Sequence, residues 1–193
     1  MKIKREPNTI PAGTAFLVSA LMIYPAFSSI TFDNDSQKIR FDLRVDCDSP
    51  SSHEACSKLG SEVDKATRFT HTMIGLDPQV SQWEAKIENA VFFLSWERDL
   101  ATLTEQEVDI VHDFIMEYLL DENMVFESDP VDGEQFSRFE QVFGEMFYQV
   151  QEVSPPIRLR AYRDMGTIYV HPLPACSDKE RPTKNRSKKK AKP

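Results

Sequence analysis

The stretch that decides the fold is SSITFDNDSQKIRFDLRVD, residues 28–46. Apolar side chains occupy every second position of its second half: Ile39, Phe41, Leu43 and Val45. Charged residues fill the positions between them, and the Asp- and Asn-rich residues 33–36 are typical of a turn. Because successive side chains of a strand point to opposite faces, this pattern predicts a hairpin with one buried and one solvent-exposed face.

A second hairpin is predicted near the C-terminus, where residues 157–163 and 167–173 flank the turn-forming residues 164–166, DMG. With a two-residue turn, the face away from the core would carry Arg158, Arg160, Tyr162, Tyr169 and His171. Arginine and aromatic side chains on a sheet face can grip phosphates and stack on bases. A bulge at the turn would break that register. The simpler interpretation, which the alternation itself favours, is a solvated face on which Arg158 and Arg160 cover apolar surface with their stems.

Apolar residues spaced three to four apart predict helices before, between and after these hairpins. Residues 12–24 lie between two prolines and predict a mostly buried helix. Residues 105–120 and 134–151 each show an apolar stripe along one side, so both are expected to pack one face against the core. The first of these two helices begins after Thr104, which has capping-box spacing to Glu107.

A further long helix is predicted between the two hairpins. Ser51 has capping-box spacing to Glu54, and Gly75 is placed to end the helix. The expected core stripe comprises Cys56, Leu59, Val63, Ala66, Phe69 and Met73.

Residues 83–97 fit both a helix and a strand, because their apolar side chains follow neither period cleanly. Their content of Phe, Val and Trp favours a strand at about 89–97. The order of elements then predicts an α+β fold: a largely antiparallel sheet, built from two hairpins and one further central strand, with four helices packed mainly on one face.

Charge divides the chain of 193 residues into two parts. Residues 178–193 hold eight Lys or Arg against Asp178 and Glu180, which gives this segment a net charge of +6. Since the whole chain has a net charge of −8, the remaining 177 residues have a net charge of −14. We therefore expect one α+β domain over 1–176 and a disordered basic tail over 177–193, because the tail has almost no apolar residues to bury.

The tail suggests the leading functional hypothesis, a small non-enzymatic accessory protein of the cytoplasm. An acidic body repels polyanions, so contact with nucleic acid or an acidic partner is expected through the tail and weakens with salt. The residues expected to make these contacts are Lys184, Arg186, Lys188, Lys189, Lys190 and Lys192, with Arg158 and Arg160 of the closing hairpin. No stretch is long and apolar enough to predict a membrane span, and no cofactor is expected.

Two alternatives remain open. One is a small hydrolase or metal-dependent enzyme that uses the 46–56 loop, where Cys47, His53 and Cys56 lie close in sequence. The spacing of these three residues does not match the paired ligands of a zinc site, so they are weak metal candidates. An exported binding domain would follow if residues 1–28 are a signal peptide, and Cys47 and Cys56 would then be candidates for a disulfide.

Overall fold

The computed structural model describes residues 12–47, 49–121, 133–151 and 157–174. These residues form four helices and six strands. The helices are α1 (Ala12–Ile23), α2 (Pro50–Ile74), α3 (Glu105–Asp121) and α4 (Gly133–Gln151). The strands are β1 (Ser29–Asp33), β2 (Lys38–Asp46), β3 (Ser81–Glu88), β4 (Val91–Asp99), β5 (Arg158–Asp164) and β6 (Thr167–Pro172).

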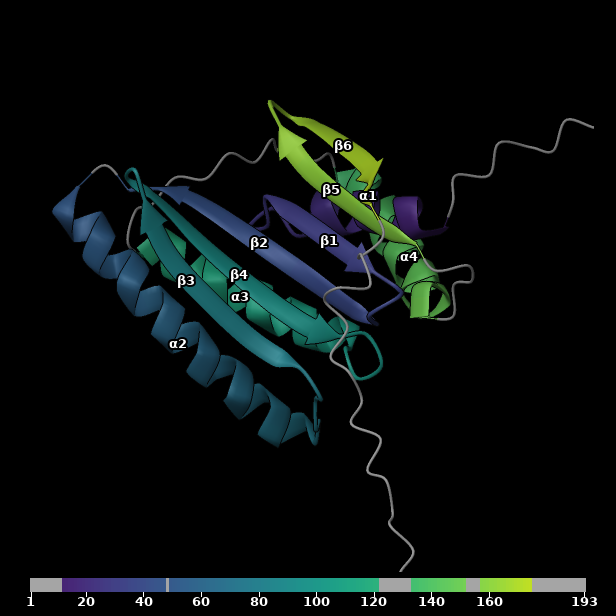
Figure 1. Ribbon diagram of the computed structural model, residues 1–193, viewed down its shortest axis with the longest axis horizontal. Coiled ribbons are helices and arrows are strands. Elements are labelled where there is room, and N and C mark those ends of the chain that lie inside the picture. Colours follow the sequence, from purple (N-terminus) through teal and green to yellow (C-terminus); the bar gives the residue numbers. More distant parts are fainter. Residues whose placement is uncertain (1–11, 48, 122–132, 152–156, 175–193) are drawn as a thin grey trace, which may run out of the picture.

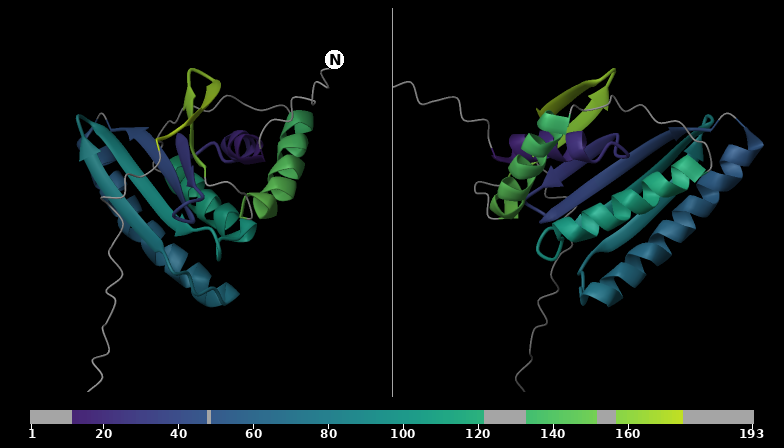
Figure 2. Two further views of the ribbon diagram at one scale, coloured as in Figure 1. Left: turned by 45° about the vertical axis from the view of Figure 1, so that its right-hand side comes forward. Right: turned by 180° about the vertical axis from the view of Figure 1, so that it is seen from behind.

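All six strands belong to one antiparallel sheet in the order β3-β4-β2-β1-β5-β6 (Figure 1). Strands adjacent in sequence form three hairpins, and the β2–β4 and β1–β5 pairings join these hairpins together. The helices lie on one side of the sheet, as the view from behind shows (Figure 2). The predicted α+β class, with an antiparallel sheet and four helices, is confirmed.

The alternation in β2 separates a core face from an open face. Ile39, Phe41, Leu43 and Val45 are all at most 2% exposed and pack under the helices. Lys38, Arg40, Asp42 and Arg44 point the other way and are half-buried or exposed. The predicted hairpin with one buried and one solvent-exposed face is therefore confirmed.

The strand expected at about 89–97 is β4, and the residues just before it form β3, so the ambiguous stretch is itself a hairpin. Its two-residue turn consists of Asn89 and Ala90, which have φ angles of 52° and 61°. Positive φ at both central positions gives a twist that matches the flanking strands, but it normally selects Asn-Gly or Asp-Gly. Alanine in this turn explains why the sequence pattern predicted one strand instead of two.

The closing hairpin has the simple two-residue turn. Met165 and Gly166 have φ angles of 44° and 73°, and the pairing from Asp164 and Thr167 runs without interruption to Leu159 and Pro172. The register that places Tyr162 opposite Tyr169 is therefore the predicted one.

Helix α1 lies between the sheet and α4. The ring of Phe16 in α1 is stacked on that of Phe143 in α4, with 5.2 Å between centroids, and meets the edge of Phe32 in β1 at 6.3 Å. This confirms the mostly buried helix, because Phe16, Leu17 and Leu21 are at most 1% exposed. Among the residues that the structure describes, no helix has both the length and the apolar character required to cross a bilayer.

Helix α2 departs from its predicted stripe at the C-terminal end. Phe69 and Met73 are 67% and 68% exposed, whereas Thr67, Thr70 and His71 are buried. The predicted stripe repeats every 3.4 residues on average, so at about 100° per residue it rotates away from the face that starts at Cys56. The prediction that Phe69 and Met73 belong to the core is wrong for this reason.

The ends of α2 are fixed by local hydrogen bonds. Ser49, two residues before the predicted cap Ser51, is the N-cap, because its side chain accepts the N–H of Ser52 at 3.1 Å. Gly75 ends the helix as predicted, with a left-handed φ of 71°. Thr104 caps α3 as expected by accepting the N–H of Glu107 at 3.2 Å.

Candidate functional site

The face of the sheet opposite the helices is hollowed over its inner strands. The hollow has a volume of about 500 Å³. It is lined by Ser28, Ser29, Arg40, Asp42, Leu43, Arg44, Lys86, Phe93, Ser95, Arg160, Tyr162, Arg163 and His171. Four of these lining residues, Arg40, Arg44, Lys86 and Arg160, are cations of the open face, whereas Arg163 points to the covered side and donates to the carbonyl of Leu21 in α1. Asp42 is the one carboxylate in this lining, so the hollow has a cationic excess within an acidic protein.

Cross-strand pairing sets these side chains in rows across the open face. One row contains Ser95, Asp42, Ser29, Tyr162 and Tyr169. The next row contains Glu97, Arg40, Thr31, Arg160 and His171. A shorter row on the other side contains Lys86, Phe93 and Arg44. Residues from β2 and β5, far apart in the sequence, therefore meet over β1.

Asp42 lies at the centre of the polar contacts in the hollow. Its Oδ1 accepts hydrogen bonds from Arg40 Nε at 2.8 Å and Ser95 Oγ at 2.7 Å. Its Oδ2 accepts one from Ser29 Oγ at 2.8 Å and lies 3.9 Å from a guanidinium nitrogen of Arg160. Asp42 therefore holds two arginines from different strands at one point on the sheet.

The outer cations of the hollow have weaker partners. The Arg44 side chain is 60% exposed and lies 3.6 Å from Asp46. Lys86 is 3.3 Å from Glu88, and its ammonium lies 5.4 Å from the centre of the Phe93 ring. Exposed pairs of this kind contribute about 0–1 kcal/mol each, so these cations can exchange their carboxylate partners at low cost.

Aromatic rings lie beside the cations at the β5–β6 end of the hollow. Tyr162 and Tyr169 are stacked with 5.4 Å between centroids, and His171 meets the edge of Tyr162 at 5.5 Å. Tyr169 is 46% exposed. These rings offer solvent-accessible surface for stacking next to Arg160.

The predicted residues Arg158 and Arg160 both lie on this open face, in the row positions that the two-residue turn sets. Arg158 lies 3.4 Å from Asp33, whereas Arg160 reaches Ser29 and Asp42. The six predicted contact residues of the tail, Lys184, Arg186, Lys188, Lys189, Lys190 and Lys192, lie outside the described residues. The structure also adds Arg40, Arg44 and Lys86, which the sequence analysis did not single out as contact residues.

The structure places Cys47, His53 and Cys56 close together but not as a set of metal ligands. The His53 ring meets the carbonyl oxygen of Cys47 at 3.1 Å. Burial raises the pKa of the Cys56 thiol, and its hydrogen bond with Cys47 raises it further, which disfavours the thiolate that a nucleophile or a ligand requires. Within residues 12–47, 49–121, 133–151 and 157–174, no group of three or more His, Cys, Asp or Glu is arranged to hold a metal ion.

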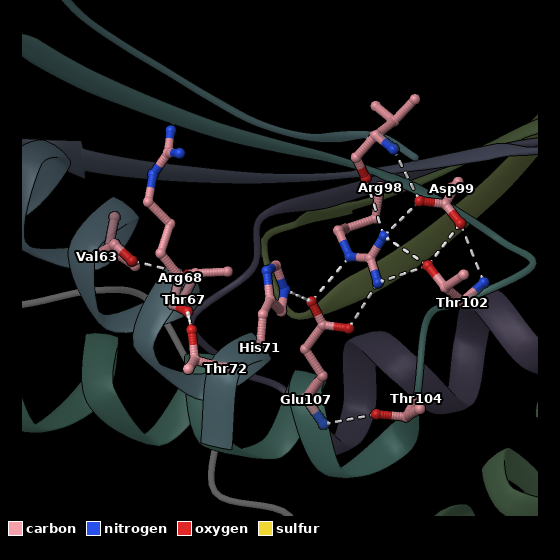
Figure 3. Close-up of polar contacts among 11 residues, drawn as sticks. Val63, Thr67, Arg68, His71, Thr72, Arg98, Asp99, Thr102, Thr104 and Glu107 are labelled. Atoms are coloured by element: carbon pink, nitrogen blue, oxygen red, sulfur yellow. Dashed lines mark hydrogen bonds and ion pairs between the residues drawn. The ribbon is translucent and has the colours of Figure 1, made fainter. Parts of the chain in front are cut away.

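A buried charge network that the sequence analysis missed lies on the covered side of the sheet (Figure 3). Arg98 of β4 and Glu107 of α3 are both 0% exposed and form a bidentate pair, with Nε–Oε1 at 2.8 Å and Nη2–Oε2 at 2.9 Å. His71 of α2 contacts the same carboxylate at 2.5 Å. Arg98 also donates to Asp99 at 2.6 Å and to the carbonyl of Val80 at 2.9 Å.

This network joins three elements and has no opening to the hollow. His71, Arg98 and Glu107 are absent from the hollow's lining, and the carboxylate of Glu107 in α3 contacts both Arg98 of β4 and His71 of α2. Its role is therefore to fix α2 and α3 on the sheet. One signal was present in the sequence, because Arg98 continues the alternate core positions of Leu94 and Trp96.

The open face thus combines cations, aromatic rings and a hollow. Comparisons of the chain with protein-family models, with curated proteins and with solved structures find no match.

Proposed function

We propose that this protein is a small non-enzymatic interaction protein that binds single-stranded nucleic acid on the open face of its sheet. In this proposal the basic C-terminal residues add salt-sensitive contacts. The supporting observation is the gathering of cationic and aromatic side chains in one hollow on the face without helices. Single-stranded nucleic acid presents phosphates and unpaired bases together, and proteins bind it with a positively charged groove and stacking rings.

The arginines of the hollow suit phosphate groups. Arg44 and Arg160 have side chains that are 60% and 46% exposed, and their nearest carboxylates lie at 3.6 and 3.9 Å, longer than a tight ion pair. A guanidinium binds phosphate through two parallel hydrogen bonds. Because the existing pairs are exposed and long, a phosphate can replace the carboxylates with little loss of stability.

Three aromatic rings beside Arg160 are suited to stacking with bases. Tyr162, Tyr169 and His171 form a continuous ring surface beside Arg160. Stacking of one base on an aromatic side chain contributes about 1–3 kcal/mol and tolerates any base. An acidic peptide can pair with the cations of the hollow but has no bases to stack on the rings. The three rings therefore favour nucleic acid over an acidic protein as the partner.

The tail supplies charge without stacking. Residues 182–193 contain no aromatic residue but include Lys184, Arg186 and four further lysines. Each phosphate that such residues neutralise releases counterions, so affinity falls steeply as salt rises. The proposal therefore assigns base contact to the sheet and long-range attraction to the tail.

Fluorescence anisotropy with a labelled oligouridine tests this proposal. The samples are the full chain, the double variant Arg160→Gln/Tyr169→Ala, and a chain ending at Ser177. We expect the double variant to bind at least about tenfold more weakly, because it loses one phosphate contact and one stacking ring. We expect the truncated chain to bind more weakly mainly at low salt, and measurements at about 50 and 200 mM salt separate these effects.

The matched control is Arg68→Gln, which removes an arginine from α2 on the other side of the sheet; its side chain is 74% exposed and paired with Asp64. This control should bind within about twofold of wild type, as expected for an arginine outside the bound surface. Equal binding by the wild type and the double variant would overturn the assignment of the site. Equal competition by polyglutamate, with the same dependence on the variants, would instead identify an acidic protein as the partner.

A further inference from the structure

Two buried thiols face each other where β2 ends and α2 begins. The sulfur atoms of Cys47 and Cys56 are 2.8 Å apart, and both residues are 0% exposed. This distance is shorter than the van der Waals separation of two sulfur atoms, and the two residues are nine positions apart in the chain. The pair lies on the covered side of the sheet, away from the residues that line the hollow.

Hydrogen bonds hold both cysteines in place. The N–H of Cys47 donates to the carbonyl of Ala90 in the β3–β4 turn at 2.7 Å. The first turn of α2 is fixed by its Ser49 cap, and Tyr118 of α3 donates to the carbonyl of Ala55, next to Cys56, at 3.1 Å. The two sulfur atoms therefore meet because rigid elements position them.

We propose that Cys47 and Cys56 are a site of intramolecular disulfide formation that links the end of β2 to the second turn of α2. The oxidant is the disulfide of a small thiol, such as oxidised glutathione. One cysteine thiolate attacks that disulfide and releases one small thiol, and the second cysteine then attacks the mixed disulfide and releases the other. Two protein thiols and one small disulfide thus give one protein disulfide and two small thiols.

Burial determines when the exchange takes place. Neither sulfur atom is accessible in the folded protein, and burial raises the pKa of the Cys56 thiol, so the attacking thiolate is scarce there. The bond therefore forms while the β2–α2 junction is open during folding. Once the junction closes, the same burial protects the bond from reducing thiols.

The bond closes a loop of about ten residues. Constraining a loop of that size in the unfolded chain stabilises a protein moderately. For a chain of this length, the oxidised form should unfold at a temperature higher by roughly 5–10 °C than the reduced form.

Refolding the full chain with a mixture of oxidised and reduced glutathione tests the proposal. The product is unfolded without reductant, alkylated and digested, and its peptides are identified by mass spectrometry. We expect a cross-linked peptide pair containing Cys47 and Cys56, and alkylation of Cys176 alone. The bond should resist dithiothreitol in the folded protein at least about tenfold longer than in urea, because its sulfur atoms are buried.

The variant Cys176→Ser is the control, since it leaves only the proposed pair and should form the same cross-link. Alkylation of both Cys47 and Cys56 after refolding with oxidised glutathione would overturn the proposal. A cross-link to Cys176 in place of the predicted one would also overturn it. Neither result depends on nucleic-acid binding, so this proposal and the proposed function stand or fall separately.

Discussion

The two faces of the sheet both place arginine beside carboxylate, with opposite consequences. On the covered face Arg98 and Glu107 are both fully buried, whereas on the open face Arg40 and Asp42 have side chains that are 43% and 19% exposed. Each pair has a contact of 2.8 Å, so distance does not separate them. The difference in exposure shows that access to water, more than geometry, decides whether an ion pair fixes the fold or is available to a ligand.

The physical reason is the cost of an unpaired charge. A buried charge that loses its partner cannot be solvated, so breaking a buried pair costs about 3–5 kcal/mol. An exposed charge that loses its partner is solvated by water or by a new ligand, and the loss is about 0–1 kcal/mol. Four predictions, in order of decreasing effect, test this contrast.

The largest effect is expected for Arg98→Met. The substitution leaves Glu107 buried without its bidentate partner, so the free energy of unfolding should fall by about 3–5 kcal/mol, measured by urea denaturation. Adding Glu107→Leu should recover part of that loss, because the second change removes the uncompensated charge. A loss below about 1 kcal/mol for Arg98→Met alone would show that the network does not fix the fold.

Neighbouring residues of β4 offer a direct comparison of the two faces. Leu94 is 1% exposed on the covered face, whereas Phe93 lies half-buried on the open face beneath Lys86. Leu94→Ala should lower the free energy of unfolding by about 2–5 kcal/mol, and Phe93→Ala by about 1 kcal/mol or less. Equal losses in the same denaturation experiment would contradict the division into a core face and an open face.

A smaller, pH-dependent effect is expected for His112 of α3. Burial lowers the pKa of His112, and the nearby Asp113 and Asp109 oppose this shift only in part. Below a pH of about 6.5, the unfolded chain takes up a proton at this histidine that the folded protein does not, so stability should fall as the pH decreases. The fall is at most about 1.4 kcal/mol per pH unit.

Replacement by phenylalanine isolates this contribution. His112→Phe should make the free energy of unfolding less dependent on pH between about 5.5 and 7. His171→Gln, which removes a histidine from the open face, serves as the matched comparison. The assignment to His112 fails if both variants show the same slope.

The smallest effect on stability, and the one that sharpens the functional contrast, is expected for Asp42→Asn. This change removes the carboxylate that lines the hollow, together with its contacts to Arg40 and Arg160. Stability should change by about 1 kcal/mol or less, because the side chains of Arg40 and Arg160 are 43% and 46% exposed and stay solvated. If the hollow binds nucleic acid, affinity for oligouridine should rise by about two- to fivefold; a weaker complex would indicate that Asp42 itself contacts the ligand.

Much of the fold could be predicted because its signals are local. Alternation in β2, the Thr104 cap and the Gly75 stop each depend on residues within a few positions of one another. The two-residue turn at Met165 and Gly166 also placed Tyr169 on the face predicted for it. Where the local signal was ambiguous, as at the Asn89–Ala90 turn, the sequence predicted one strand where the structure has a hairpin of two.

The candidate site was predictable only in part. Arg160 was expected on the open face, but nothing local to it indicates that β1 would bring it within 3.9 Å of Asp42. The buried network could not be predicted from the sequence for the same reason, because His71, Arg98 and Glu107 come from separate elements.

By itself, the sequence determined the period of most elements, the class of the fold and the segregation of charge at the C-terminus, because these follow from the order of neighbouring residues. Only the tertiary structure decided which strands are adjacent, which charged residues meet and which of them keep contact with water. Those outcomes depend on contacts between residues far apart in the chain, and burial alone then decides whether the same arginine–carboxylate pair supports the fold or remains open to a partner.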